Sequence, residues 1–213
     1  MLEQIAYILI AAGAATGLYL QSGIPQGKPR RHMFVFYTNQ SNAIIAVYHI
    51  LLLVGSFSPE GGLYQALSNA TVRFSLTLMI WVTHIIYHFV LVPHFKRHRE
   101  KYEDNRHTFG NLCVHYLVPL ATLLEWALWA DKGVTLLSCV IWLLIPVAYL
   151  IYCVLRAAIC GPIGSGTARY PYAFMDLDLL GPKKWVRNLV LVLGFYFLLA
   201  LTLLGAARIL ENL

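Results

Sequence analysis

Six apolar segments, each about 17 to 25 residues long, dominate this chain, and a helix of that length crosses the hydrocarbon core of a bilayer. They cover residues 4–20, 33–57, 72–92, 109–130, 134–155 and 185–204. Of the 213 residues, 59% are hydrophobic and 12% are charged, whereas charged residues make up about a quarter of a soluble domain. The sequence therefore predicts an all-α fold, a polytopic bundle of six transmembrane helices that forms one transmembrane domain over residues 1–213.

The first apolar segment is expected to be retained as a membrane helix. A cleavable signal peptide carries basic residues before its apolar stretch, and here the nearest basic residue, Lys28, follows it. The segment contains Gly13-Ala-Ala-Thr-Gly17, a spacing of small residues that lets two helix backbones approach closely. We interpret these glycines as a helix-packing face.

The net charge of +6 does not indicate a nucleic-acid partner, because the basic residues are spread over short loops and do not gather on one soluble face. Thirteen of the 16 Lys and Arg residues fall in the first, third and fifth loops or their flanks: Lys28, Arg30, Arg31, Lys96, Arg97, Arg99, Lys101, Arg106, Arg156, Arg169, Lys183, Lys184 and Arg187. Basic loops stay in the cytoplasm. This bias predicts cytoplasmic odd-numbered loops and both termini outside.

The second segment begins with an unusual polar stretch, Phe36-Tyr-Thr-Asn-Gln-Ser-Asn42. Five consecutive polar residues, Thr38 to Asn42, are costly inside a membrane and face either other helices or a cavity. They therefore mark either a contact between helices or a functional site.

Histidines of two other segments are expected at a similar depth. Counted from Met33, Thr38 lies ~7–8 Å along its helix, and His115 lies ~9 Å from Phe109, at 1.5 Å per residue. His84 and His88 approach the same cytoplasmic half from the third segment, as does the aromatic loop Tyr170–Asp176. Polar side chains from four parts of the chain should meet in one leaflet.

This combination of residues suits ester cleavage. A threonine hydroxyl becomes a useful nucleophile when a neighbouring base accepts its proton, and histidine is the usual base near neutral pH. The side-chain amides of Asn39, Gln40 and Asn42 are candidate donors to a developing oxyanion. On pattern alone, the alternative that these residues join helices and that His115 is a core histidine stays open.

Three motifs carry a resemblance to a known family. They are Phe36-Tyr-Thr-Asn-Gln-Ser-Asn42, then Asn111-Leu-Cys-Val-His115 with Pro119 and Glu125-Trp126, then Tyr170-Pro-Tyr-Ala-Phe-Met-Asp176 before Gly181-Pro182. In this order, over most of the chain and with six apolar segments, the sequence resembles the androgen-induced membrane hydrolases and, through Asn39 to Asn42, their bacterial branch.

The resemblance implies an intramembrane threonine hydrolase that cleaves lipid esters such as fatty acid esters of hydroxy fatty acids. It assigns the nucleophile to Thr38 and the essential histidine to His115. Substrate-binding or oxyanion-supporting roles are expected for Asn39, Gln40, Ser41, Asn42, His84, His88, Tyr172 and Asp176. The expected partners are the bilayer and a membrane lipid in a bacterial cytoplasmic membrane, without metal, cofactor or nucleic acid.

Other interpretations remain open at this point. The same Thr–His pair could transfer the acyl group to a lipid alcohol instead of water. The intramembrane histidines could instead serve a haem-binding or transport protein. Cys113 is a weaker nucleophile candidate, because it lies 200° around the helix from His115 at 100° per residue. Asp176 either orients the histidine or caps the following helix.

Overall fold

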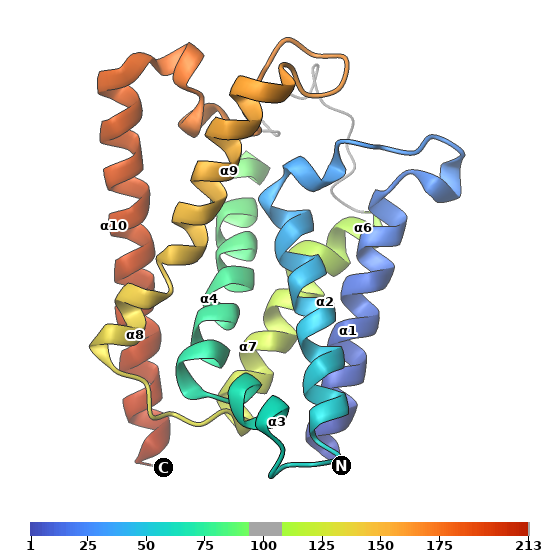
Figure 1. Cartoon of the computed structure of the whole chain (residues 1–213), viewed down its shortest axis with the longest axis vertical. Coiled ribbons are helices and arrows are strands. Elements are labelled where there is room, and N and C mark those ends of the chain that lie inside the picture. Colours follow the sequence, from blue (N-terminus) through green and yellow to red (C-terminus); the bar gives the residue numbers. More distant parts are fainter. Residues whose placement is uncertain (94–107, 213) are drawn as a thin grey trace.

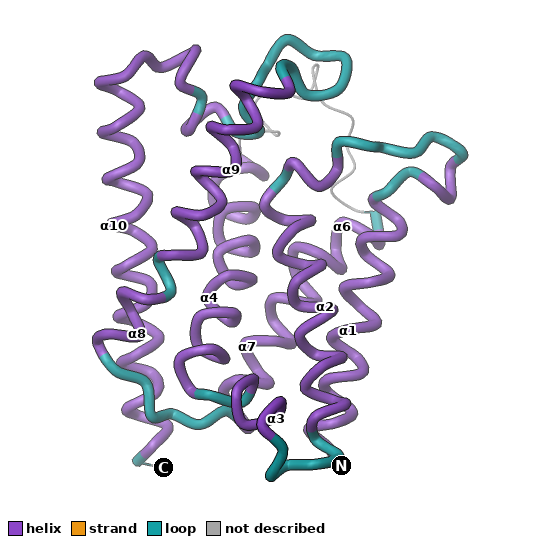
Figure 2. The backbone as a smooth tube through the Cα atoms, in the orientation of Figure 1, coloured by secondary structure: helices purple, strands orange, loops and turns teal. Residues whose placement is uncertain are grey.

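The computed structural model describes residues 1–93 and 108–212, which form a bundle of helices without any strand in these ranges (Figures 1 and 2). The α-helices are α1 (Leu2–Gln21), α2 (Tyr37–Gly55), α3 (Gly62–Leu67), α4 (Ala70–Ile86), α6 (Phe109–Leu112), α7 (Val118–Trp129), α8 (Leu136–Ile141), α9 (Leu144–Cys160) and α10 (Leu177–Glu211). Two π-helical turns extend this set, η3 (Tyr87–Leu91) after α4 and η5 (Cys113–Leu117) between α6 and α7. The 3-10 turns are η1 (Ile24–Gln26), η2 (Met33–Val35) and η6 (Ala173–Met175).

Five helical segments are long and apolar enough to cross a membrane: Leu2–Gln26, Ala70–Leu91, Phe109–Trp129, Leu136–Cys160 and Leu177–Glu211. This supports the prediction of a multi-pass, all-helical membrane protein. The α2 helix lies in the predicted second span, 33–57, and is 19 residues long. It is not one of the five, because the polar residues of its first turns lower its mean hydropathy.

The two ends of the bundle carry different parts of the chain. Both termini and the short α3 helix lie at one end in Figure 1. The connection from α1 to α2, the C-terminal end of α4 and the loop between α9 and α10 lie at the opposite end, which we call the site end. The basic residues predicted in the third loop, Lys96, Arg97, Arg99, Lys101 and Arg106, lie outside the described residues.

The second helix starts later than its apolar segment predicted. Met33–Val35 forms the separate turn η2, and Phe36 is extended with φ −86° and ψ 135°. The α2 helix therefore begins at Tyr37, which puts Thr38 in its first turn. Counting the depth of Thr38 from Met33 was wrong because these residues do not continue one helix.

The last two predicted spans also have different boundaries. Segment 134–155 contains two helices, α8 and α9, and α9 extends to Cys160. Pro146 lies in the first turn of α9, where a missing N–H costs little. The α10 helix is longer than the predicted 185–204 and is kinked at Gly181, whose φ of 69° is left-handed, just before Pro182.

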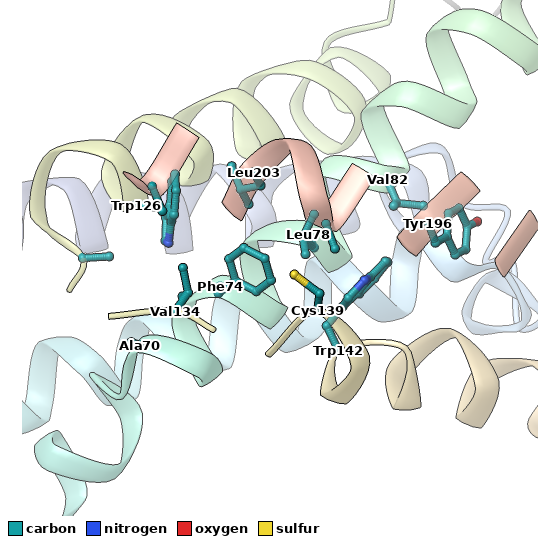
Figure 3. Packing of buried hydrophobic residues seen from close by; sticks show 13 residues of the cluster. Ala70, Phe74, Leu78, Val82, Trp126, Val134, Cys139, Trp142, Tyr196 and Leu203 are labelled. Carbon is teal, nitrogen blue, oxygen red and sulfur yellow. The ribbon is translucent and has the colours of Figure 1, made fainter. Parts of the chain in front are cut away.

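A large apolar core holds α4, α7, α8 and α10 together (Figure 3). Phe74 and Leu78 of α4 meet Trp126 of α7 and Trp142, which follows α8, while Tyr196 of α10 packs against Trp142 with ring centroids 5.6 Å apart. Burial of such aromatic side chains dominates the energetics of a core. The core fixes α4 and α7, the two helices that carry the π-helical turns.

The α1 helix packs tightly on the segment that contains His115. A Cβ atom on Gly17 would lie 2.7 Å from Val114 Cγ1 and 2.9 Å from Cys113 Cβ. The corresponding distance from Gly13 to Val118 Cγ2 is 3.4 Å. The predicted glycine packing face is thus confirmed, and Gly17 is its close point.

Candidate functional site

Thr38 lies in the first turn of α2, where backbone N–H groups have no partner within the helix. The Tyr37 N–H donates to the Tyr172 hydroxyl at 3.2 Å, which ties the loop before α10 to the start of α2. The Thr38 side chain lies within hydrogen-bonding reach of the same hydroxyl. Within the described ranges, the Thr38 N–H has no hydrogen-bond acceptor, so it is available to a ligand.

Two of the amides that follow Thr38 bind the preceding turn. Asn39 Nδ2 donates to the Met33 carbonyl at 2.8 Å, and Gln40 Nε2 donates to the Phe34 carbonyl at 2.7 Å. These bonds close the connection between η2 and α2. Each side-chain amide therefore has one of its two N–H donors engaged in this connection.

Ser41 and Asn42 join α2 to its neighbours. Asn42 Nδ2 donates to the Thr38 carbonyl at 2.8 Å and to the Val114 carbonyl at 3.1 Å. The Ser41 hydroxyl bonds the Thr38 carbonyl at 3.0 Å and the Thr83 hydroxyl of α4 at 3.1 Å. Four of the five polar residues thus make hydrogen bonds that hold α2 in place, and Thr38 and Asn39 are the two of the five that line the outer pocket.

His115 is held by contacts from α4 and η3. Its side chain is 6% exposed, and its ring lies parallel to the Tyr87 ring, with centroids 3.7 Å apart and planes 13° from parallel. The imidazole also lies beside the Thr83 backbone carbonyl. Its buried Nδ1 has no hydrogen-bond partner among residues 1–93 and 108–212, so the hydrogen-bonding capacity of this nitrogen is unused.

His115 and Tyr87 both lie in π-helical turns, η5 and η3. A π-helical turn inserts an extra residue into a helix and occurs frequently at functional sites. The His115 carbonyl is bonded by His84 Nδ1 at 2.8 Å, so α4 holds the backbone of this turn as well as its side chain. The two helices are therefore irregular at the point where they meet.

Two pockets meet at Thr38. The outer pocket has a cavity volume of about 780 Å³ and includes Thr38, Asn39, Asn111 and His115 in its lining. The inner pocket has a cavity volume of about 60 Å³ and extends between α4, α9 and α10. Five residues line both: Thr38, Tyr87, Leu91, Tyr172 and Phe174.

The structure thus brings Thr38 and His115 to one pocket, as the sequence predicted. Across the described part of the chain, no direct hydrogen bond joins the Thr38 hydroxyl to the imidazole. Catalytic hydrogen bonds are often long in the absence of substrate and shorten in the substrate complex. The observed relationship between the two residues is that they line the same pocket.

Of the remaining predicted residues, Tyr172 lines both pockets, whereas His84, His88 and Asp176 are not part of either lining. Burial raises the pKa of the Tyr172 phenol to about 12, which keeps the hydroxyl protonated at neutral pH. His84 contacts the site through its bond to the His115 carbonyl, whereas exposed His88 bonds the Tyr116 hydroxyl at 3.0 Å. Asp176 caps α10 by accepting from the Asp178 and Leu179 N–H groups, each at 3.0 Å.

Sequence reasoning missed two tyrosines of the site. Tyr87 was missed because the spacing of His84 and His88, four residues apart, draws attention to the helix face that carries these two histidines. Tyr87 lies on the neighbouring face. Tyr149 of α9 donates to the Val35 carbonyl at 2.9 Å, and its ring lies 4.9 Å from that of Tyr37. The signal for Tyr149 is weak, because aromatic residues are common in membrane helices for packing alone.

Metal-binding residues do not cluster at this site. Within residues 1–93 and 108–212, no three His, Cys, Asp or Glu side chains are grouped so that they could hold a metal ion. Comparisons with models of protein families, with curated proteins and with solved structures found no match to this chain.

Proposed function

We propose that this protein is a membrane-embedded ester hydrolase in which Thr38 is the nucleophile and His115 is the general base. One observation carries the proposal: two side chains from separate helices, α2 and η5, line a single pocket. Each has an unengaged group suited to its role, the free backbone N–H of Thr38 and Nδ1 of His115. The resemblance of the sequence motifs to threonine hydrolases points to the same pair.

The reaction has two steps. The Thr38 oxygen bonds to the ester carbonyl carbon while its proton passes to His115. The bond from that carbon to the alcohol oxygen then breaks, and His115 returns the proton to the departing alcohol. Water, deprotonated by His115, attacks the acyl-threonine ester, releases the carboxylic acid and restores the Thr38 hydroxyl.

The predicted amides of Asn39 and Gln40 hold the connection between η2 and α2, so we take the donors to the oxyanion of each tetrahedral intermediate from other groups. The Tyr172 hydroxyl accepts a bond from the Tyr37 N–H, so its own proton is available to donate toward the carbonyl oxygen. The N–H of Thr38 at the start of α2 is the second donor, where the helix dipole also favours negative charge. We therefore assign the oxyanion site to Tyr172 and the Thr38 backbone.

The substrate class is a membrane lipid ester, and the protein is placed in the cytoplasmic membrane of a bacterium. Apolar side chains cover the exposed faces of the helices, including Leu9, Leu124, Leu155 and Leu198. In this proposal α2 also crosses the membrane as the second of six spans, with its polar first turns at the site and mostly apolar residues in the rest of the helix. The loop charges put the site end in the cytoplasm and both termini outside.

The test uses purified protein and a long-chain ester in detergent or nanodiscs. Thr38→Ala and His115→Gln are expected to lose hydrolysis and labelling by an alkyl phosphonate. The matched controls are Thr122→Ala and His49→Gln, which change a buried threonine and a buried histidine away from both pockets. Full activity in Thr38→Ala of confirmed fold would overturn the mechanism.

A further inference from the structure

We propose that the ester binds in one orientation, with its acyl chain in the inner pocket and its alcohol part in the outer pocket. This inference rests on the proposed function and adds a substrate class to it. The substrate would be an ester of a slim, unbranched fatty acyl chain with a bulkier alcohol. The orientation follows from the pockets that Thr38, Tyr172 and His115 line.

The position of Thr38 divides any bound ester into two parts. Since Thr38 lines both pockets, a carbonyl carbon bonded to its oxygen lies at their junction. The two groups on that carbon, the acyl chain and the alcohol oxygen, must then enter different pockets. Tyr172 lines the same junction and donates to the third group, the carbonyl oxygen.

His115 determines which part enters which pocket. The departing alcohol oxygen must receive a proton from His115, and general acids act within hydrogen-bonding distance. His115 lines the outer pocket and is not part of the inner lining. The alcohol therefore occupies the outer pocket, and the acyl chain is left with the inner one. Water for the second step reaches His115 by the path that the alcohol vacates.

The shape and lining of the pockets agree with this assignment. Beyond its tyrosines and threonines, the inner pocket is lined by apolar side chains of α4, α9 and α10, among them Val82, Ile86, Leu150, Val192 and Leu193, and by others from η3 and η6. Its cavity volume of about 60 Å³ is less than a tenth of the 780 Å³ outside, so a bulky or branched group is accommodated by the outer pocket. The outer pocket adds polar groups from Gln21, Asn39 and Asn111, which suit a more polar alcohol.

The experiment compares two ester series on wild-type protein and two matched variants. One series varies the acyl chain in length and branching on a fixed alcohol, and the other varies the alcohol on a fixed palmitoyl chain. Leu193→Phe narrows the inner pocket, whereas Val90→Phe adds the same ring to the outer pocket. Size-exclusion chromatography and thermal denaturation show whether each variant is folded.

We expect Leu193→Phe to lower the ratio of kcat/KM for palmitoyl over butyryl esters by about tenfold or more, the effect of a methylene-scale clash. Its ranking of alcohols should stay that of wild type. Val90→Phe should instead change the ranking of alcohols and keep the acyl ratio. The reverse pattern would overturn the orientation, and so would an unchanged ratio of kcat/KM for palmitoyl over butyryl esters in folded Leu193→Phe. Either result does so only if hydrolysis still depends on Thr38. Loss of Thr38 dependence would overturn the proposed function itself.

Discussion

The Tyr87 ring lies flat against the His115 imidazole, with centroids 3.7 Å apart and planes 13° from parallel. Asn111 Nδ2 donates to the Tyr87 hydroxyl at 2.5 Å, and His84 bonds the His115 carbonyl at 2.8 Å. These contacts hold both the ring plane and the backbone of the histidine. Tyr87 is therefore a positioning residue for the proposed base.

Replacing Tyr87 should separate the effect of the ring from that of the hydroxyl. Tyr87→Leu removes the stacked ring and should lower kcat by about tenfold to a hundredfold, the scale of a misplaced catalytic group. Tyr87→Phe keeps the ring and should recover most of this loss. Steady-state kinetics of the two variants check the prediction, and equal losses in both would contradict a positioning role for the ring.

A glycine pair on α1 provides a test of the packing behind His115. Gly17→Ala places a methyl group 2.7 Å from Val114 Cγ1, whereas Gly13→Ala places one at 3.4 Å from Val118 Cγ2. Overpacking of this kind costs about 1–3 kcal/mol. Gly17→Ala should lower both the melting temperature and the activity per folded molecule, because Val114 directly precedes His115. Gly13→Ala is the control, and equal behaviour of the two variants would argue against the close approach.

A buried ion cluster lies at the opposite end of the bundle from the site. Arg73 pairs with Glu125, both 3% exposed, and with Glu3 at 3.2 Å. Breaking a buried pair costs about 3–5 kcal/mol, and removal of the Glu125 charge leaves the buried Arg73 paired with Glu3, whose side chain is 28% exposed. Glu125→Gln should therefore lower the melting temperature markedly, while kcat/KM of the folded fraction stays that of wild type.

The control for this change is Glu211→Gln, which removes a surface pair with Arg208 whose side chains are 53% and 48% exposed. Such pairs contribute about 0–1 kcal/mol. Thermal denaturation of the two variants should therefore differ clearly. A melting temperature in Glu125→Gln as high as in Glu211→Gln would contradict a stabilising role for the cluster.

The Tyr172 phenol gives a prediction for pH dependence. Burial raises its pKa to about 12 from the ordinary value of 10.0, an effect that the Thr38 side chain partly offsets. The neutral phenol, the donor form, therefore persists as pH rises and is lost only near pH 12. Enzymatic kcat should not fall between pH 8 and 10 through ionisation of this group, after subtraction of spontaneous hydrolysis.

Tyr172→Phe checks the assignment of the phenol as a donor. Loss of one oxyanion donor lowers kcat by about 10²–10³, and this loss should be constant from pH 8 to 10. A Tyr172→Phe protein with wild-type kcat would exclude the hydroxyl from the oxyanion site. A wild-type rate that declined around pH 9, with no such decline in Tyr172→Phe, would contradict the raised pKa.

The positions of the helices follow largely from hydrophobicity, whereas their irregularities do not. All six apolar segments contain helices, and the spacing of Gly13 and Gly17 alone predicts a packing face. The turns η3 and η5 could not be predicted, because their residues are ordinary helix formers and the extra residue is set by contacts between α4 and α7. The short α3 helix was also missed, since six residues with Gly61 and Gly62 at the start resemble a loop.

The sequence predicts that Thr38 and His115 meet at one end of the bundle, and both line the outer pocket. The depth count behind this prediction was wrong for Thr38, because Met33–Val35 and α2 are separate helical turns. Asn39 and Gln40 bond carbonyls of the η2 turn, which is separate from α2 although hydropathy predicts one continuous segment. Ser41 and Asn42 bond groups of α4 and η5, and such contacts between helices cannot be derived from hydropathy. Tyr172 belongs to an aromatic loop that the sequence places at the site, but its position beside the Tyr37 N–H is a tertiary contact.

The most direct test of the central claim is to locate the covalent intermediate by mass spectrometry. Purified protein is treated with an alkyl phosphonate and digested, and the modified residue is identified by fragmentation. We predict modification of Thr38 in wild type and in the Thr122→Ala and His49→Gln controls, with none in Thr38→Ala and a strong reduction in His115→Gln. Modification of Cys113 or Ser41 with Thr38 unmodified, or labelling that persists in Thr38→Ala, would contradict the account.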